Sequence, residues 1–179
     1  MIREMVTNDI QEFPLLFAKQ GWQKSADIFQ RYYHEQENNQ RKILVALDNH
    51  SLIGYVTLVP IATAGPFKGR YPEIKDFNIL EKYQGLGYGR ALLAAAETQI
   101  AKISDVATIG VGLHSGYGTA QRLYVRSGYV PDGSGVWYRD HVLGQNQECF
   151  NDDDLVLYLS KALRENTDRS YFKPRGVNM

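Results

Sequence analysis

Three glycines at alternate positions are the residues of this chain with the clearest chemical use. The segment from Gln84 to Arg90 reads Gln-Gly-Leu-Gly-Tyr-Gly-Arg and runs directly into a stretch rich in alanine and leucine, which is typical of a helix. Glycine at a helix start costs about 1 kcal/mol relative to alanine, so packing alone does not explain three of them. Their backbone N–H groups have no Cβ beside them and lie at the positive end of a helix dipole, which suits a diphosphate. The segment therefore predicts a phosphate-bearing ligand.

The elements that must position this segment include both strands and helices. Apolar runs bounded by turn residues predict strands at 2–6, 42–47, 52–60, 73–80, 106–113, 136–139 and 155–159. Helical spacing predicts helices from a cap at Thr7 or Asn8 through Phe17, from Ser25 onward, from the glycine segment to Ile103, and from Thr119 to Ser127. Strands and helices alternate in the middle of the chain and hairpins stand at both ends. We therefore expect an α/β (α+β) fold with one mixed, mostly antiparallel sheet of six or seven strands and helices on both faces.

The composition disfavours several classes of protein. The chain has 179 residues, the size of one domain, and its 20 basic and 20 acidic residues leave no net charge, so the basic excess of a nucleic-acid binder is missing. Its one cysteine, Cys149, indicates a reducing compartment, and the neighbouring residues supply no base for a nucleophile. No run approaches the roughly 20 apolar residues that cross a bilayer, and the N-terminus does not resemble a signal peptide. We expect a cytoplasmic protein with no nucleic-acid and no membrane partner.

Two blocks of the sequence together resemble the GNAT superfamily of N-acetyltransferases. A strand followed by Gln84-x-x-Gly87-x-Gly89 and a helix resembles the pyrophosphate-binding signature of that family. The later block, Ala120-Gln-Arg-Leu-Tyr124-Val-Arg-Ser-Gly128-Tyr129, resembles its second signature, with an alanine, a Leu-Tyr pair and a Gly-aromatic ending. The blocks stand in the family's order, with room for one helix and one strand between them. The resemblance covers residues 1–161 as one domain and leaves a polar C-terminal tail at 162–179.

The resemblance implies acetyl-CoA as a co-substrate and no metal. The backbone of the glycine segment would hold the pyrophosphate, and the implied contact residues are Gln84, Gly85, Leu86, Gly87, Tyr88, Gly89 and Arg90. Ile79 and Leu80, at the end of the preceding strand, are implied to pair with the pantetheine arm like an extra strand. That pairing needs a sheet splayed in the middle, and family members open it with a β-bulge in this strand. The incomplete alternation between Glu73 and Leu80 is compatible with such a bulge.

Tyr124 is the proton donor that the resemblance implies. Acetyl transfer from a thioester to an amine needs a base, because the amine starts protonated with a pKa near about 10, and a donor for the leaving thiolate. Tyr124 matches the tyrosine that the family places close to the departing sulfur. Its spacing from Ala120 and Leu123 also suits a core aromatic, and one tyrosine can bury its ring while presenting its hydroxyl.

Three residues are candidates for the base. Glu73 begins the central strand at a place where many family members carry a glutamate that deprotonates the amine, often through water. Asp76 lies three residues later and could face the same cleft if the strand is bulged. His114 ends the following strand and has an imidazole, whose ordinary pKa suits base work. Each also has a plain structural interpretation, as a solvated strand-end charge or a structural histidine.

Two further segments bear on specificity. Tyr117 stands where many relatives have an asparagine, so the segment from His114 to Gly118 is expected to shape the acceptor pocket differently. The acidic run from Asn151 to Asp154 lacks the spaced oxygens and closing glutamate of a calcium loop, and a solvated turn is the favoured interpretation.

Two functions from different classes remain open. The leading hypothesis is an N-acetyltransferase that acts on a primary amine of a small molecule or a peptide, and the alternative is a non-catalytic CoA-binding or sensing module. Tyr124 beside an available glutamate favours the enzyme. A dinucleotide oxidoreductase is set aside, because that fingerprint needs its third glycine one residue later and an acidic residue about 20 positions on. The resemblance also admits a homodimer, since many relatives are dimers.

Overall fold

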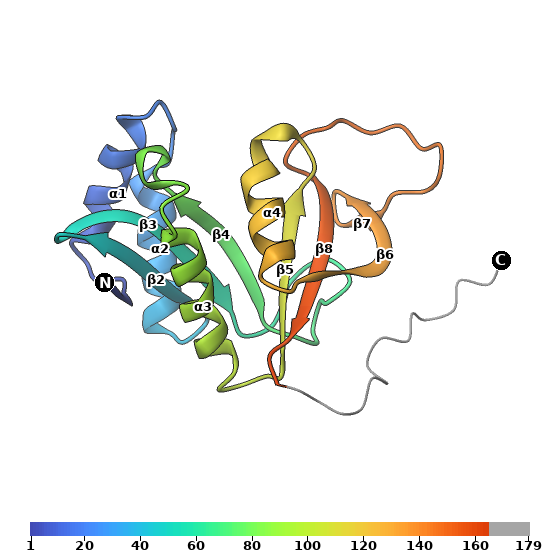
Figure 1. Cartoon of the computed structure of the whole chain (residues 1–179), viewed down its shortest axis with the longest axis horizontal. Helices are drawn as coiled ribbons and strands as arrows, with labels where there is room; N and C mark the ends of the chain where they lie inside the picture. The colour runs from blue at the N-terminus through green and yellow to red at the C-terminus, as the bar shows by residue number, and fades with distance from the viewer. Residues whose placement is uncertain (165–179) are drawn as a thin grey trace. The chain divides into compact units, whose positions relative to one another are not determined.

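The computed structural model describes residues 1–164 of the 179, and this part of the chain has a mixed α/β fold with eight mostly antiparallel strands. The sequence predicted six or seven strands, so the fold class is confirmed and the number of strands is corrected. The chain divides into two compact units, described separately below and labelled element by element in Figure 1. The first unit comprises Met1–Pro60 and Ile74–Gln99, and the second comprises Ile61–Glu73 and the chain from Ile100 onward.

The strands of the first unit follow the order β1-β2-β3-β4. Their bounds are β1 (Ile2–Glu4), β2 (Lys42–Asp48), β3 (Ser51–Val59) and β4 (Glu73–Ile79). A two-residue turn joins β2 to β3, and both of its residues, Asn49 and His50, have a positive φ (44° and 68°). Two such residues in succession are typical of a type I′ turn, whose twist matches that of the flanking strands.

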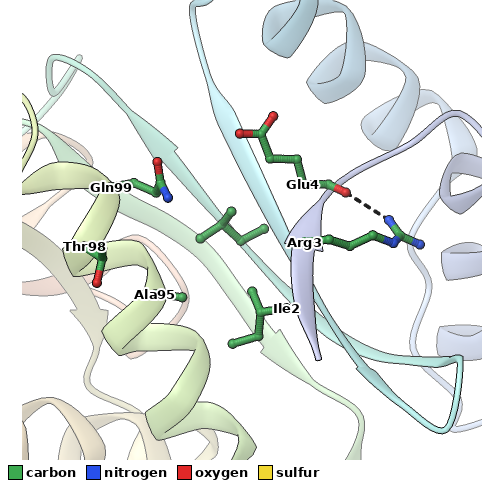
Figure 2. A pocket seen from close by; sticks show the side chains of 7 residues that line it. Ile2, Arg3, Glu4, Ala95, Thr98 and Gln99 are labelled. Atoms are coloured by element: carbon green, nitrogen blue, oxygen red, sulfur yellow. Dashed lines mark hydrogen bonds between the residues drawn. The ribbon is translucent and has the colours of Figure 1, made fainter.

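Three helices cover the two faces of these strands: α1 (Asp9–Ala18), α2 (Ala26–Glu37) and α3 (Tyr88–Ile100). Successive residues of β2 face opposite sides, as the two-residue period of a strand requires. Ile43 and Val45 pack into the core cluster that includes Phe13 of α1 and Phe29 of α2. Leu44, between them, lines instead a shallow pocket bordered by α3 and β1, where Figure 2 shows Ala95, Thr98 and Gln99 opposite Ile2.

Aromatic rings form the centre of the first core. Tyr55 of β3 is fully buried, and its ring centroid lies 5.1 Å from that of Phe13 and 5.2 Å from that of Phe29, both in edge-on arrangements. Such edge-to-face pairs add to the free energy gained by burial. Tyr55 is therefore held rigidly by its ring, and its hydroxyl points to a polar cluster described below.

The strands of the second unit follow the order β5-β8-β6-β7 and pair antiparallel. Their bounds are β5 (Val106–Gly112), β6 (Val130–Tyr138), β7 (His141–Val142) and β8 (Leu155–Ala162), with α4 at Gly118–Arg126 and a short 3-10 turn, η2, at Ser115–Tyr117. The ring of Tyr158 in β8 lies so close to Gly65 that a Cβ there would collide with it, and a Cβ at Gly110 would make a tight contact with the same ring. Phe67 and Trp137 pack edge-on against the same ring, which makes Tyr158 the centre of a second aromatic cluster.

Several boundaries differ from those expected from the sequence. The third helix was expected to extend to Ile103, but α3 ends at Ile100 and Ile103 is 63% exposed. β6 begins at Val130 rather than 136, because its pairing with β8 shifts register between Pro131 and Val136, where Gly133 and Gly135 both have a positive φ. Such a bulge removes the regular alternation that marks a strand. The short β7 was not predicted at all.

The C-terminal boundary can be followed as far as Arg164. β8 continues to Ala162, the Leu163 N–H donates to the Asp105 carbonyl (2.8 Å), and Arg164 pairs with the Asp105 carboxylate at 3.1 Å. The rest of the expected polar tail, residues 165–179, lies outside the described residues.

Candidate functional site

The glycine segment forms an open turn between β4 and α3. A 3-10 turn, η1 (Glu81–Tyr83), follows β4, and α3 begins at Tyr88. Gly85 and Gly87 have φ values of +76° and +91°, in the left-handed region that favours glycine, and a Cβ at either position would meet no atom within 4 Å. The turn is therefore set by backbone conformation and leaves open space on its surface.

The start of α3 is suited to an anion. A helix leaves the N–H groups of its first turn without partners inside the helix, and α3 has no acidic residue in that turn to compete with a ligand. Arg90 is exposed in the same turn and adds a positive charge. The Tyr88 side chain turns away toward β2, where its hydrogen bond to Asp48 raises the pKa of its hydroxyl. These features fit the pyrophosphate of acetyl-CoA.

Hydrogen bonds from a side chain and from the backbone anchor the turn where it leaves β4. The Gln84 side chain donates to the Ile79 carbonyl (2.9 Å), and the Leu80 N–H donates to the Ile53 carbonyl (2.9 Å). Ile79 and Leu80 are buried, whereas Leu86 at the tip is 66% exposed. The two residues predicted to pair with a pantetheine arm thus lie at the anchored base of the turn.

Asp76 lies in the middle of β4 with a left-handed φ of 43°. A left-handed residue inside a strand is the geometry of a bulge, which the family resemblance implied for this strand. Four donors converge on the carboxylate: Lys24 Nζ at 2.7 Å, Asn78 Nδ2 at 2.7 Å, the Tyr55 hydroxyl at 2.6 Å and the Tyr32 hydroxyl at 3.1 Å.

The electrostatics of this cluster keep Asp76 ionised. Burial by itself raises the pKa of the carboxyl, but the charge of Lys24 and the hydrogen bonds from Lys24, Tyr55 and Tyr32 outweigh it, so the pKa is lowered. Burial and the Asp76 charge raise the pKa of Tyr32 to about 12 and raise that of Tyr55 as well. Asp76 is therefore a carboxylate that is already engaged by neutral phenols and an ammonium, and such a group is a poor general base.

Glu73 is the first residue of β4, and it belongs to the second compact unit. Its side chain is buried (4% exposed) and lies near Tyr158 of the second aromatic cluster. Burial, followed by the charges of Glu73 and Asp140, raises the pKa of Tyr158 to about 12. Glu73 is thus a buried acidic residue near one aromatic side chain, that of Tyr158.

Both ring nitrogens of His114 have hydrogen-bonding partners in the second unit. Nδ1 accepts from the Gly116 N–H (3.1 Å), and Nε2 lies 3.0 Å from Asp153 Oδ1. The Tyr117 hydroxyl donates to the same Asp153 oxygen (3.0 Å), and its ring meets that of His114 edge-on at 4.6 Å. The bonds from His114 and Tyr117 lower the pKa of Asp153. The acidic run was expected to be a solvated turn, and one of its residues, Asp153, also forms a hydrogen bond with His114.

Tyr124 is carried by α4 and is 4% exposed, so the expectation of a buried aromatic ring is met. Burial, with a smaller contribution from Tyr117, raises the pKa of its hydroxyl. The group therefore stays protonated at neutral pH and remains able to donate. The Tyr117 ring contacts that of His114, and its hydroxyl affects the pKa of Tyr124. Tyr117 is the residue that stands where many relatives carry an asparagine.

Sequence reasoning did not pair the predicted residues with their partners. Lys24, Tyr32 and Tyr55 surround Asp76, and Asp153 holds His114. One signal was present for Tyr55, since its phenol stands in a strand made mostly of apolar residues. Lys24 gave no signal, because it lies in the connection between α1 and α2, where a lysine is ordinary.

Residues 1–164 contain neither a metal-binding cluster nor a membrane-spanning helix. That part of the chain holds no group of three or more His, Cys, Asp or Glu side chains arranged to hold a metal ion. None of its helices is both long and apolar enough to traverse a bilayer.

Comparisons with known proteins agree with the fold and with the two sequence blocks. Residues 4–129 match the model of the acetyltransferase (GNAT) family. The yncA protein of Salmonella typhimurium, solved with acetyl-CoA, has a TM-score of 0.65 at 18% identity, covering 94% of this chain and 96% of its own. A ribosomal-protein-alanine N-acetyltransferase from Brucella melitensis has a TM-score of 0.66 at 17% identity, with coverages of 91% and 99%. An aminoglycoside 6'-N-acetyltransferase complexed with coenzyme A has a TM-score of 0.64 at 16% identity, with coverages of 94% and 99%.

No curated protein matches the sequence. The structural likenesses, all at low identity, establish the fold, and the match over residues 4–129 confirms the resemblance inferred from the two blocks.

Proposed function

The chain belongs to the GNAT acetyltransferase family, and from that premise we propose that it transfers an acetyl group from acetyl-CoA to a primary amine. The observation that carries the proposal is the turn at Gly85 and Gly87: two left-handed glycines with open space around them, directly before a helix whose first turn has no acidic residue. This combination binds a diphosphate through backbone N–H groups. Bound acetyl-CoA supplies the thioester, and the protein supplies position and proton transfer.

The residues of the turn have distinct parts in the proposed cofactor site. The N–H groups from Leu86 to Arg90 hold the pyrophosphate, and Gly87 and Gly89 let it approach the backbone closely. The Ile79 carbonyl accepts from Gln84 but retains a second lone pair, so it can also accept from a pantetheine amide. Gln84 therefore both anchors the turn and orients that carbonyl.

Tyr124 is the proposed proton donor. Its hydroxyl is protonated at neutral pH, as an ordinary phenol is, and burial raises its pKa further. Donating this proton to the departing sulfur removes the cost of releasing a bare thiolate, whose conjugate acid has a pKa near about 8.5 by analogy with cysteine.

Glu73 is the proposed base, because of its position at the start of β4, where many family members carry a glutamate. Asp76 is ion-paired with Lys24 and accepts three further hydrogen bonds, and both nitrogens of His114 have other partners. Either residue would have to give up those contacts before it could take a proton. Glu73 deprotonates the amine in this proposal, directly or through a water molecule, as its position at the start of β4 in the family implies.

The first experiment separates binding from turnover. Acetyl-CoA should raise the melting temperature of the protein, whereas NADH and ATP should raise it less, and free thiol should then appear with at least one member of an amine panel. The panel contains n-butylamine, an aminoglycoside and a peptide with an N-terminal alanine. Stabilisation without thiol release from any amine would favour a CoA-binding module, and no stabilisation would contradict the cofactor site.

Tyr124→Phe tests the donor. Turnover should fall on the order of 100-fold with little change in acetyl-CoA affinity, because the ring is kept and only the proton is lost. Tyr129→Phe is the matched control, since Tyr129 is also buried and its ring centroid lies 6.1 Å from that of Tyr124. Full turnover by Tyr124→Phe would remove Tyr124 from the mechanism.

A further inference from the structure

The ammonium group of Lys24 is held in a site built by other elements of the first unit. It donates to Asp76 Oδ1 at 2.7 Å and to the Tyr55 hydroxyl at 2.6 Å. It also lies 5.2 Å from the centroid of the Tyr55 ring and 5.7 Å from that of Phe17, within the range of a cation–π interaction. A carboxylate, a phenol oxygen and aromatic faces are together the groups that select a primary ammonium ion.

We propose that Asp76, Tyr32 and Tyr55 form a binding site for the ammonium group of the acceptor, and that Lys24 fills this site until the acceptor displaces it. The proposal rests on the function proposed above, and it narrows the acceptor to amines that present a primary alkylammonium group. A neutral alcohol of the same length lacks the charge that Asp76 requires, and an anion would be repelled by it.

The walls of the site are rigid, because the core holds them. Tyr55 is fully buried among Phe13, Phe17 and Phe29, and its hydroxyl donates to Asp76 while accepting from Lys24. Tyr32 extends from α2 and donates to the second carboxylate oxygen. Removing Lys24 would therefore leave a preformed set of acceptor atoms and ring faces.

Lys24, by contrast, belongs to no helix or strand. It lies in the connection between α1 and α2, which also contains Gly21 with a φ of +80° and open space around it. Its side chain is 20% exposed, so it reaches the site from the surface. A long flexible side chain on such a connection can leave its partners without disturbing the core.

Neighbouring charges limit what else can enter. Arg41 lies 4.3 Å from the centroid of the Tyr32 ring, and its guanidinium pairs with Glu35 and donates to Thr57. Arg31 also lies over Tyr32, at 5.6 Å. Two guanidinium groups beside Tyr32 disfavour a second positive charge on that side, so the site takes one ammonium at the end of a neutral chain.

The first test uses the unaltered full-length protein and n-butylammonium, which reproduces the four-carbon chain and charge of a lysine side chain. We expect the amine to shift the nitrogen and proton NMR signals of the Lys24 ammonium as the Lys24–Asp76 contact is lost, whereas 1-butanol should leave them unchanged. Lys42, paired with the exposed Glu4, serves as the internal control. Lys24 signals that stay unchanged at the highest amine concentration the fold tolerates would overturn the proposal.

Two variants give an independent reading by calorimetric titration. Lys24→Met should bind n-butylammonium about tenfold more tightly than the unaltered protein, since the internal competitor is gone. Lys42→Met, which removes one lysine charge elsewhere in the first unit, should not change the affinity. The double variant Lys24→Met/Asp76→Asn should lose the gain. If Lys24→Met failed to fold, the NMR titration of the unaltered protein would still decide.

Thiol release with n-butylamine and acetyl-CoA separates this proposal from the proposed function. Displacement of Lys24 without thiol release would contradict acetyl transfer to this amine and leave the ammonium site standing. Thiol release with an undisturbed Lys24 signal would support the enzyme and overturn the site.

Discussion

The turn at Gly85 and Gly87 and the cluster around Asp76 lie in the same unit, on either side of the end of β4, yet they are built in opposite ways. The turn has open space on its surface and an anion-attracting helix start, whereas the Asp76 carboxylate is already contacted by four donors. Backbone N–H groups at an exposed helix start can be hydrated until a ligand arrives. A partly buried carboxylate must find partners within the fold, because an unpaired buried charge is costly. The protein can thus leave an anion site open but must fill a cation site from within.

The largest effect is expected when a side chain fills the open space at the Gly85–Gly87 turn. Gly87→Glu should lower acetyl-CoA affinity at least about 100-fold, or about 2.7 kcal/mol, because it adds a negative charge beside the phosphate position and a side chain at a φ of +91°. Calorimetric titration with acetyl-CoA measures the loss. Gly133→Glu is the control, since Gly133 also has a positive φ (+86°) with open space around it but lies in β6. Equal losses in both variants would mean that charge or instability, and not the turn, is responsible.

The next largest effect is expected when the Asp76 cluster loses its negative charge. Asp76→Asn removes the charge that pairs with Lys24. The two side chains are only 20% (Lys24) and 22% (Asp76) exposed, so we expect a loss of about 2 kcal/mol in the free energy of unfolding. Glu4→Gln changes a comparable pair with Lys42 whose side chains are more exposed (54% and 36%), and it should cost less than about 1 kcal/mol. Urea unfolding measures both. Equal costs would show that the Asp76 cluster is no more than a surface ion pair.

Acid should weaken the Asp76 cluster selectively. The folded state lowers the pKa of Asp76 from an ordinary value of 3.8, so its contribution to stability is complete above pH 3.8 and is lost as the pH falls through the lower folded value. The free energy of unfolding should therefore decline more steeply below pH 3.8 in the unaltered protein than in Asp76→Asn. Asp153 shifts in the same direction, but its carboxylate is exposed and contributes less. Parallel declines in both proteins would contradict the assignment.

The smallest effect concerns a single hydroxyl of the cluster. Tyr32→Phe keeps the ring and removes the 3.1 Å hydrogen bond to Asp76, so unfolding should become easier by about 0.5 to 1 kcal/mol. Tyr33→Phe on the same helix is the control and should have almost no effect. A larger loss from Tyr33→Phe would show that the Tyr32 hydroxyl is not a significant part of the cluster.

Local sequence chemistry predicted the parts of the fold that depend on neighbouring residues. The helix expected to end at Ser127 is followed by Gly128 with a left-handed φ (+91°), and Ser25, where the second helix was expected to begin, directly precedes α2. The strands expected at 42–47 and 52–60 pair as the β2–β3 hairpin. Each of these features is determined within a few residues, so its signal survives in the sequence alone.

Partnerships between distant residues could not be predicted in the same way. Asp153 reaches His114 across 39 positions and Lys24 reaches Asp76 across 52, and nothing in either local pattern marks the partner. β6 was shortened because its bulge hides the alternation on which strand prediction depends. The family blocks indicated which residues to consider, but the partners of Asp76 and His114 are seen only in the structure.

The tight turn at Asn49 and His50 also has a consequence for the order of folding. It lets β2 and β3 pair while closing almost no chain, and such hairpins form within about 1 to 10 μs. β5 of the second unit must wait for β8, whose residues follow it by about 50 positions, so its pairing closes a long loop and is slower. During synthesis, the first unit can begin to assemble at the β2–β3 hairpin while the second still lacks the strand that completes its sheet.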